Sequence, residues 1–309
     1  MPKLSDAQGV YIVTQTPFGP QGELDLDSID SLVDFYLEHG ADGFTVLGVA
    51  GEAAKLTPRE AEQVAERFIR RAQGRPVIVG VSQPSLAQLV SLTGRAMELG
   101  ASGVMIAPPT GLRTEEELLN YFGAVFQHIG DVPTVLQDFP FSTGVWMSVA
   151  SMLRLVETHA QIQLIKEEDL PSLGKIERLR ASTGRRVAIL TGNNGIYLPL
   201  ELARGIDGPM AGFSHPEMLS QVWRLHRQGD REAAHDLFDA YLPLLSHENQ
   251  SQWGVAVRKE ILQRRGAIRC AAMRQPGPRL GSRDQADIDL LLRRLAARLA
   301  RGDLLRPAG

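Results

Sequence analysis

Residues 162–169 read Ile-Gln-Leu-Ile-Lys-Glu-Glu-Asp, an apolar run that ends in a lysine followed by three acids. The chain has 33 basic side chains, and only five of them are lysines: Lys3, Lys55, Lys166, Lys175 and Lys259. A neutral amine at the end of an apolar strand can attack a carbonyl carbon and form an imine. We therefore identify Lys166 as a candidate nucleophile.

The chemistry requires Lys166 to lose its proton. A free lysine, with a pKa of about 10.4, is protonated at neutral pH, and an apolar pocket lowers that pKa. Leu164 and Ile165 provide apolar neighbours, whereas the three following acids favour the ammonium form. These acids must point elsewhere or act as acid and base. The alternative is a lysine that extends to solvent at a strand end and pairs with an acid.

Strand alternation separates the neighbours of Lys166 into two sets. If Lys166 points into a barrel, Leu164 and Glu168 point inward with it. Ile165 and Glu167 then face the outer helices. Glu168 is therefore the acid that we expect beside the amine.

The length and charge of the chain narrow the function. A chain of 309 residues fits one large α/β barrel with an appendage or two ordinary domains. A formal charge of -3 and a pI near 6.2 argue against nucleic-acid binding. We expect a small-molecule substrate.

Membrane and redox signals are weak in this sequence. No basic segment followed by an apolar one is visible at the start, and the longest charge-free run, 76–94, is interrupted by polar residues. The single cysteine, Cys270, cannot form an internal disulfide. We expect a cytoplasmic protein that does not bind membranes.

Eight apolar runs of the β type alternate with segments of helical periodicity. Continuous apolar strands indicate burial on both faces, as in parallel sheets. Eight such repeats predict a closed (β/α)8 barrel over residues 1–229. Helices without intervening strands follow, so we expect a C-terminal helical domain over 230–309. The expected strands are 10–15, 43–48, 76–82, 103–107, 134–138, 162–167, 187–191 and 209–213.

The helices have recognisable starts. Thr57 and Glu60 have the spacing of a capping box, and Thr114 precedes three glutamates. The expected helices include 25–38, 61–73, 114–128, 217–228, 230–245, 250–266 and 284–301, with a loop over 273–283.

In such a barrel the reacting groups lie at the carboxyl ends of the strands. Those ends carry one lysine, Lys166, among hydroxyls, amides and glycines. Backbone amides in small-residue loops can hold a carboxylate without a second cation. This composition suits a 2-keto acid, whose carboxylate docks on amides while its carbonyl meets the amine.

These residues together resemble the dihydrodipicolinate synthase and N-acetylneuraminate lyase superfamily over roughly 9–265. Members are class I Schiff-base lyases on an eight-stranded barrel with C-terminal helices, and the resemblance implies that Lys166 forms the imine. It also implies a homotetramer or homodimer that requires no cofactor. The matching marks are Thr16-Pro17-Phe18, Gly48-x-x-Gly51-Glu52, Pro140 with Thr143-Gly144, Ile165-Lys166-Glu167 and Gly192.

Several positions depart from the synthase branch. Val49 and Ala50 replace two threonines, and Gln137 replaces the tyrosine that serves as proton shuttle. Thr110 stands for a second tyrosine, and Ser142 for the arginine that binds the second substrate. A neutral amide cannot act as a general base, so the synthase mechanism does not transfer directly.

A branch similar to L-2-keto-3-deoxyarabonate dehydratase matches better. That branch has Gln-Asp after strand five, a glutamate two residues beyond the lysine, and a His-Glu-Asn stretch in the C-terminal helices. This chain has Gln137-Asp138, Glu168 and His247-Glu248-Asn249. The resemblance and the alternation argument therefore agree on Glu168.

The predicted reaction is dehydration or aldol cleavage of a 2-keto-3-deoxy sugar acid through a Lys166 imine. Glu168 would act as the base, and Gln137 belongs to the catalytic set. The expected substrate-binding residues are Thr16, Val49, Ala50, Gly51, Ser82, Asp138, Asn193 and Gly212, with the amides of Ala50 and Gly51 at the carboxylate.

Other assignments stay open. Asp138 could instead cap the turn before Pro140, and Asn193 is of a type common in turns. His247-Glu248-Asn249 could reach the site or lie on a helix surface. No pair of histidines, cysteines or acids has metal-ligand spacing, so we expect no metal. Synthesis of 4-hydroxy-tetrahydrodipicolinate from pyruvate and aspartate semialdehyde is the alternative reaction, and a non-catalytic keto-acid-binding homologue is the alternative class.

Overall fold

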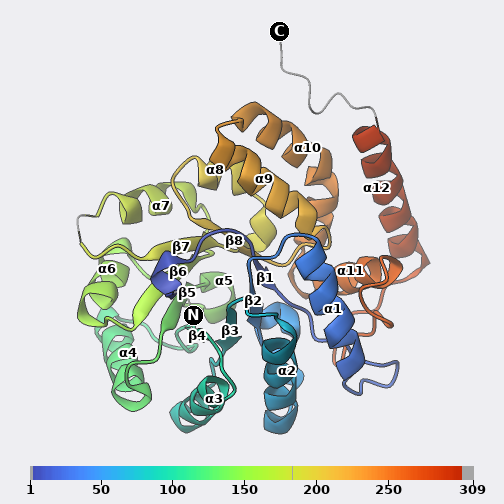
Figure 1. The fold of residues 1–309 in the computed structure, drawn as a ribbon. Coiled ribbons are helices and arrows are strands. Elements are labelled where there is room, and N and C mark those ends of the chain that lie inside the picture. The colour runs from blue at the N-terminus through green and yellow to red at the C-terminus, as the bar shows by residue number, and fades with distance from the viewer. Residues whose placement is uncertain (1–2, 183, 301–309) are drawn as a thin grey trace.

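Eight short parallel strands form a closed barrel in the computed structural model, which describes residues 3–182 and 184–300 (Figure 1). Each strand pairs with the next along the chain, and β8 closes the barrel on β1 through the pair Ile12↔Ala211. The predicted (β/α)8 barrel is confirmed. The strands are β1 Tyr11–Val13, β2 Gly43–Val46, β3 Val77–Gly80, β4 Gly103–Ile106, β5 Thr134–Asp138, β6 Ile162–Glu167, β7 Ala188–Thr191 and β8 Gly208–Ala211.

Alternate side chains of the strands form two apolar layers. The inner layer fills the barrel and includes Leu164 and Met210, with Leu4 packed against it from the short helix η1, Leu4–Asp6. The outer layer lies between the strands and the helices and includes Ile165 and Ala211. Burial on both faces explains why the strands read as continuous apolar runs.

The helices surround the barrel and continue beyond it. The expected capping box is present, because the Thr57 hydroxyl accepts from the Glu60 N–H. The start predicted at Thr114 forms a second one, in which the Thr114 hydroxyl accepts from the Glu117 N–H. The helices are α1 Leu26–Glu38, α2 Pro58–Arg71, α3 Leu86–Glu98, α4 Glu115–Ile129, α5 Pro140–Thr143, α6 Val149–Thr158, α7 Leu173–Arg180, α8 Leu198–Leu202, α9 Pro216–Gln228, α10 Arg231–Glu248, α11 Ser251–Arg264 and α12 Ser282–Ala300. Residue 301, where the last helix was expected to end, lies outside the described residues.

Most predicted strands are one to three residues longer than the observed ones. The run 43–48, for example, stops at Val46 because Leu47 has a left-handed backbone with φ of 57°. A left-handed residue turns the chain away from its neighbour and ends the ladder. The runs predicted for β5 and β6 match the observed strands.

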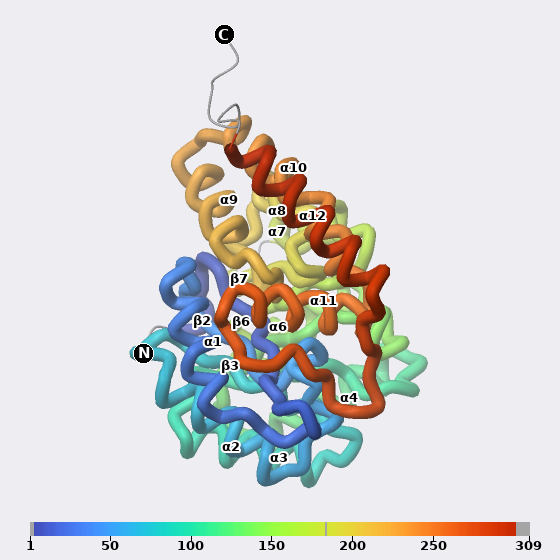
Figure 2. Tube along the Cα trace, turned by 90° about the vertical axis from the view of Figure 1, so that its right-hand side faces the viewer, coloured from blue at the N-terminus to red at the C-terminus, as the bar shows by residue number. Residues whose placement is uncertain are grey.

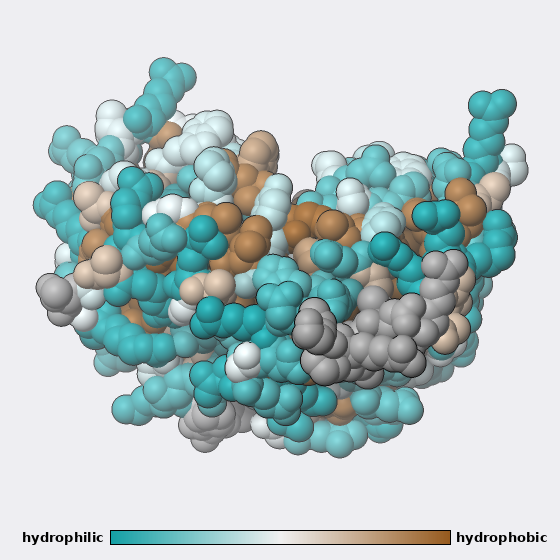
Figure 3. Space-filling model, turned by 90° about the horizontal axis from the view of Figure 1, so that it is seen from above, coloured by the Kyte–Doolittle hydropathy of each residue, from teal (hydrophilic) through white to brown (hydrophobic). Residues whose placement is uncertain are grey.

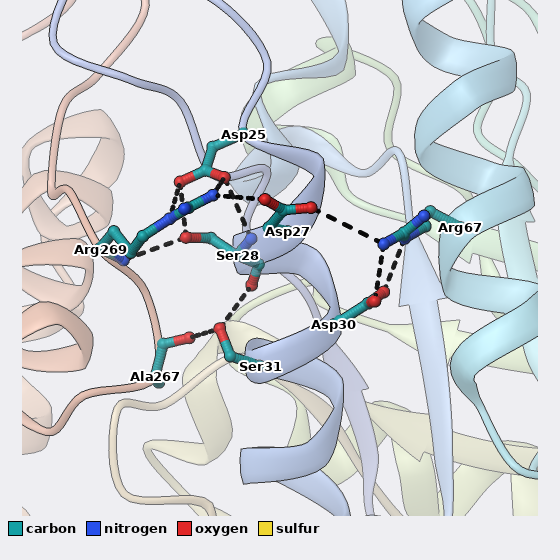
Figure 4. A network of polar contacts seen from close by, with 8 residues as sticks. All are labelled: Asp25, Asp27, Ser28, Asp30, Ser31, Arg67, Ala267 and Arg269. Carbon is teal, nitrogen blue, oxygen red and sulfur yellow. Dashed lines mark hydrogen bonds and ion pairs between the residues drawn. The ribbon is translucent and has the colours of Figure 1, made fainter.

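The C-terminal helices fold back on the barrel. Helix α10 packs along α9, and α12 lies along α10 (Figure 2). The chain after α11 then returns to α1, where the Ser31 hydroxyl donates to the Ala267 carbonyl at 2.8 Å and Arg269 pairs with Asp25 (Figure 4). The predicted division near residue 230 coincides with the start of α10 and stays a prediction.

Within the described ranges, no helix combines the length and the apolar composition that a bilayer span requires. The expected cytoplasmic location stays a prediction.

Seen from above, the surface is hollowed between two raised parts, and hydrophobic side chains show on both sides of the hollow (Figure 3).

Candidate active site

Lys166 lies beside a carboxylate at the carboxyl end of β6. Its Nζ is 3.0 Å from Oε2 of Glu168, and both side chains are buried. The Gln137 side chain on β5 donates from Nε2 to the same oxygen at 2.7 Å. Two neighbouring strands thus place an amine, a carboxylate and an amide in contact, as the sequence predicted for Lys166 and Glu168.

Strand register explains this contact. Gln137 is paired with Lys166, and Asp138 with Glu167, in the β5–β6 ladder. Leu164 belongs to the inner apolar layer, so Lys166, two residues on, also faces the interior. Glu168 continues the same side, and its N–H still donates to the Asp138 carbonyl at 2.9 Å.

The end of β7 leaves room for Glu168. A Cβ added at Gly192 would lie 2.2 Å from Oε1 of Glu168 and 2.4 Å from its Cγ, so only glycine fits here. The next residue, Asn193, donates from Nδ2 to the Glu168 carbonyl at 3.1 Å. Asn193 therefore holds the backbone of Glu168, a contact that strand-end position alone did not predict.

Asp138 faces away from the amine. Its carboxylate is completely buried and pairs with Lys175 of α7, which also contacts Asp169 at 3.0 Å. This placement corrects the expectation that Asp138 binds substrate. The reason is the alternation itself, because two consecutive strand residues cannot both face the interior.

Behind Lys166, Glu167 lies in the same buried outer layer as Asp138. Burial raises the pKa of the Glu167 carboxyl to about 9, and the neighbouring Asp138 charge acts in the same direction. Burial raises the pKa of Asp138 as well, so this pair of carboxyl groups holds a proton at neutral pH and Lys175 balances the remaining charge. The sequence analysis did not find Lys175, although the scarcity of lysines marked it.

The loop after β2 is the expected carboxylate-binding turn. It forms the short 3-10 helix η2, Val49–Gly51. The N–H of Gly51 donates to the Gly48 carbonyl at 3.0 Å, and Thr16 holds the loop by donating from Oγ1 to the Gly51 carbonyl at 2.7 Å. Among the described residues, nothing accepts from the N–H of Ala50. We expected the N–H groups of both Ala50 and Gly51 to be free for a carboxylate, but in the described part of the chain only that of Ala50 is free. Thr16, expected to bind substrate, instead supports the loop.

The remaining predicted ligands occupy the same end of the barrel but make other contacts. Ser82 accepts from the Ala107 N–H at 2.9 Å and so joins the loops after β3 and β4. The Val49 side chain is 58% exposed. Gly212 is buried directly after β8. None of these three has a hydrogen bond to Lys166 or Glu168 within the part of the chain that the structure describes.

A buried ion pair fixes the loop after β2 from the C-terminal helices. Lys259 on α11 is fully buried, and its Nζ lies 2.5 Å from Oε1 of Glu52, the residue that follows η2. Lys55 pairs with the other oxygen of Glu52 at 2.9 Å, and the Arg274 N–H donates to it at 3.1 Å. The sequence placed Glu52 in a motif but did not reveal its partners.

The His247-Glu248-Asn249 stretch reaches the barrel end through its last two residues. Asn194 donates from Nδ2 to the Glu248 carbonyl at 3.2 Å and to Oδ1 of Asn249 at 3.1 Å. The Glu248 carboxylate is buried and accepts from the Ser214 N–H and from Nε of Arg258, each at 3.2 Å. The stretch therefore connects α10 and α11 to the loops after β7 and β8.

Comparison with known proteins supports the resemblance that the sequence motifs indicated. A model of the dihydrodipicolinate synthetase family matches residues 6–294. L-2-keto-3-deoxyarabonate dehydratase of Azospirillum brasilense is 30% identical over 294 residues, covering 93% of this chain and 94% of that protein. The 4-hydroxy-tetrahydrodipicolinate synthase of Aquifex aeolicus is 30% identical over 75% of this chain and 81% of its own length.

Among solved structures, a dihydrodipicolinate synthase from Rhodopseudomonas palustris superimposes with a TM-score of 0.92 at 45% identity. The match covers 94% of this chain and 99% of that one. The resemblance found in the sequence is confirmed at the level of the family.

Glu167→Gln tests the protonation behind the site. The folded protein keeps a proton on Glu167 up to about pH 9, whereas the unfolded chain releases it near 4.5. The free energy of unfolding therefore falls as pH rises through this window. Glutamine does not titrate, so the variant lacks this pH-dependent loss of stability. We expect the Tm of the variant to match the wild type near pH 5 and to exceed it at pH 8. A Tm difference that does not change with pH would contradict the assignment.

Lys259→Met tests the ion pair that holds the loop after β2. Removal of one member leaves the Glu52 carboxylate buried without its fully buried partner, and we expect a loss of about 3 kcal/mol of unfolding free energy. The control is Lys55→Met, which removes the more exposed partner of the same carboxylate and should cost less. Urea unfolding of the wild type and the two variants gives the free energies to compare. Equal stability of the two variants would refute the role of Lys259 in holding the loop.

Proposed function

Because the chain belongs to the dihydrodipicolinate synthetase family, we propose that it dehydrates a 2-keto-3-deoxy sugar acid through an imine on Lys166. The protein is a lyase, and the family works through a lysine Schiff base. The observation that carries the proposal is the contact of Lys166 with Glu168, 3.0 Å apart and supported by Gln137.

Imine formation needs a base beside the amine. Glu168 is the carboxylate in position to accept the proton that Lys166 must lose. The neutral amine then adds to the C2 carbonyl, and the resulting hydroxyl leaves as water with the proton that Glu168 returns, which gives the protonated imine and restores the Glu168 carboxylate. The carboxylate of the substrate docks on the loop after β2, where the N–H of Ala50 is available.

Dehydration then requires two proton transfers, one from C3 and one to the hydroxyl that leaves C4. The imine nitrogen acts as an electron sink, so Glu168 can remove a proton from C3 and form an enamine. The enamine expels the C4 hydroxyl, which leaves as water with the proton that Glu168 returns. Hydrolysis of the imine releases the product and restores Lys166.

Gln137 acts as a positioning residue in this scheme. Its amide donates to Glu168 and cannot accept a proton under these conditions, so the proton transfers pass to the carboxylate. After β7, Asn193 donates to the Glu168 carbonyl, and Gly192 leaves space for the Glu168 side chain. This support favours dehydration chemistry over a non-catalytic homologue, which would not need a carboxylate held against the lysine from two strands.

Synthesis of 4-hydroxy-tetrahydrodipicolinate is the second candidate, favoured by relatives of that name with 30 to 31% identity. Val49, Ala50 and Gln137 stand where the synthase branch is expected to carry hydroxyl groups. In the proposed reaction the Glu168 carboxylate carries out the proton transfers that a relay of hydroxyl groups performs in the synthase branch. We therefore rank dehydration first.

Assembly and location complete the proposal. We propose a homotetramer or homodimer in the cytoplasm that needs no cofactor. Phe141 and Trp146 follow β5 and are 71% and 68% exposed, which supports self-association because large aromatic side chains on a surface favour protein contacts.

A substrate comparison tests the reaction. We expect loss of water from a 2-keto-3-deoxypentonate, and no condensation of pyruvate with aspartate semialdehyde. Glu168→Gln should lower kcat for dehydration by roughly 100-fold or more, since a general base is lost, and Lys166→Ala should abolish it. Turnover of only the second substrate pair would establish the synthase instead.

A further inference from the structure

Arg258 is a buried arginine whose two outer nitrogens, Nη1 and Nη2, lack an acceptor within the part of the chain that the structure describes. It lies on α11, and its side chain is 2% exposed. Nε donates to Glu248 at 3.2 Å, but no described residue accepts from Nη1 or Nη2. Neither nitrogen is among the fully enclosed side-chain atoms that lack a partner, so both retain some accessible surface and border open space.

The guanidinium reaches the inner side of β8. Met210 belongs to the inner apolar layer and Ala211 to the outer one, so position 212 faces the interior. A Cβ at Gly212 would lie 2.5 Å from the Val13 carbonyl oxygen and 2.9 Å from Nη1 of Arg258. Glycine at this position therefore makes room for both the backbone of β1 and the arginine, at the barrel end that carries Lys166.

A second donor lies at the same point. Nε2 of Gln15 would be 3.4 Å from the same added Cβ, while the Oε1 atom of Gln15 is occupied by the Tyr36 hydroxyl at 2.6 Å. The Gln15 amide thus presents its nitrogen, which makes one contact, to Val13 O at 3.3 Å. Gln15 is fully buried, so of the two groups at Gly212 only the Arg258 guanidinium is placed to meet an acceptor oxygen of a ligand.

We propose that Arg258 binds an oxygen at the far end of the substrate, beyond the carbons that react at Lys166. This inference rests on the proposed function. Glu248 already balances the charge of the guanidinium, so a neutral hydroxyl fits better than a second carboxylate. The substrate class is thereby a 2-keto-3-deoxy acid that ends in a hydroxyl group.

Arg258→Lys is the decisive variant. Lysine keeps a cation for Glu248 but lacks the two Nη groups. Loss of hydrogen bonds from this charged donor should raise the half-saturating concentration of a 2-keto-3-deoxypentonate about 10-fold or more. Pyruvate has no far oxygen, and the concentration at which borohydride traps it on the enzyme should not change. Arg264→Lys, on the more exposed side of the same helix, is the matched control.

The outcomes separate the two proposals. An unchanged half-saturating concentration for the pentonate, or an equal rise for pyruvate, overturns the role of Arg258. A larger loss for an analogue with a terminal carboxylate overturns the hydroxyl assignment. If wild-type protein traps neither keto acid, the proposed function itself fails, and this inference fails with it.

A change in folding is checked separately. Thermal unfolding of Arg258→Lys shows whether the variant is folded. If it is not, the pair Arg258→Gln with Glu248→Gln removes both charges together and avoids a lone buried carboxylate. The same rise for the pentonate and the same constancy for pyruvate are expected, and their absence overturns the proposal.

Discussion

The contact between Lys166 and Glu168 is the constraint on which the site depends. An amine and a carboxylate two residues apart on one strand share a side only because a strand alternates. Burial makes such a pair costly unless other groups support it. Gln137 from β5 and the absence of a side chain at Gly192 provide that support. Gln137 on β5 and the turn after β7 therefore position the Glu168 carboxylate beside the Lys166 amine at the end of β6.

The C-terminal helices contribute to this end of the barrel although they lie outside it. Lys259 fixes Glu52 after the loop that follows β2, and Arg258 fixes Glu248 beside β8. These adjacent residues of α11 thus reach two different barrel loops. The helical extension is part of the architecture of the site, and the family match, which covers residues 6–294, includes α11.

Much of this arrangement was predictable from the sequence. Apolar runs and capping residues predicted the strands, and alternation placed Glu168 with Lys166. The same rule should have excluded Asp138, whose neighbour Gln137 already faces inward. The ion pair of Glu52 with Lys259 spans 207 positions in the sequence, and no local pattern reveals such a partner. The fit of Glu168 against Gly192 likewise depends on the packing of β6 against β7.

The most direct measurement of the central claim is the mass of the peptide that contains Lys166 after incubation with pyruvate and borohydride. A reduced imine adds the mass of one reduced pyruvate unit to that peptide. The account predicts this increase at Lys166 in the wild type and none in Lys166→Arg. An increase located on Lys175 or Lys259, or none at all, would contradict it.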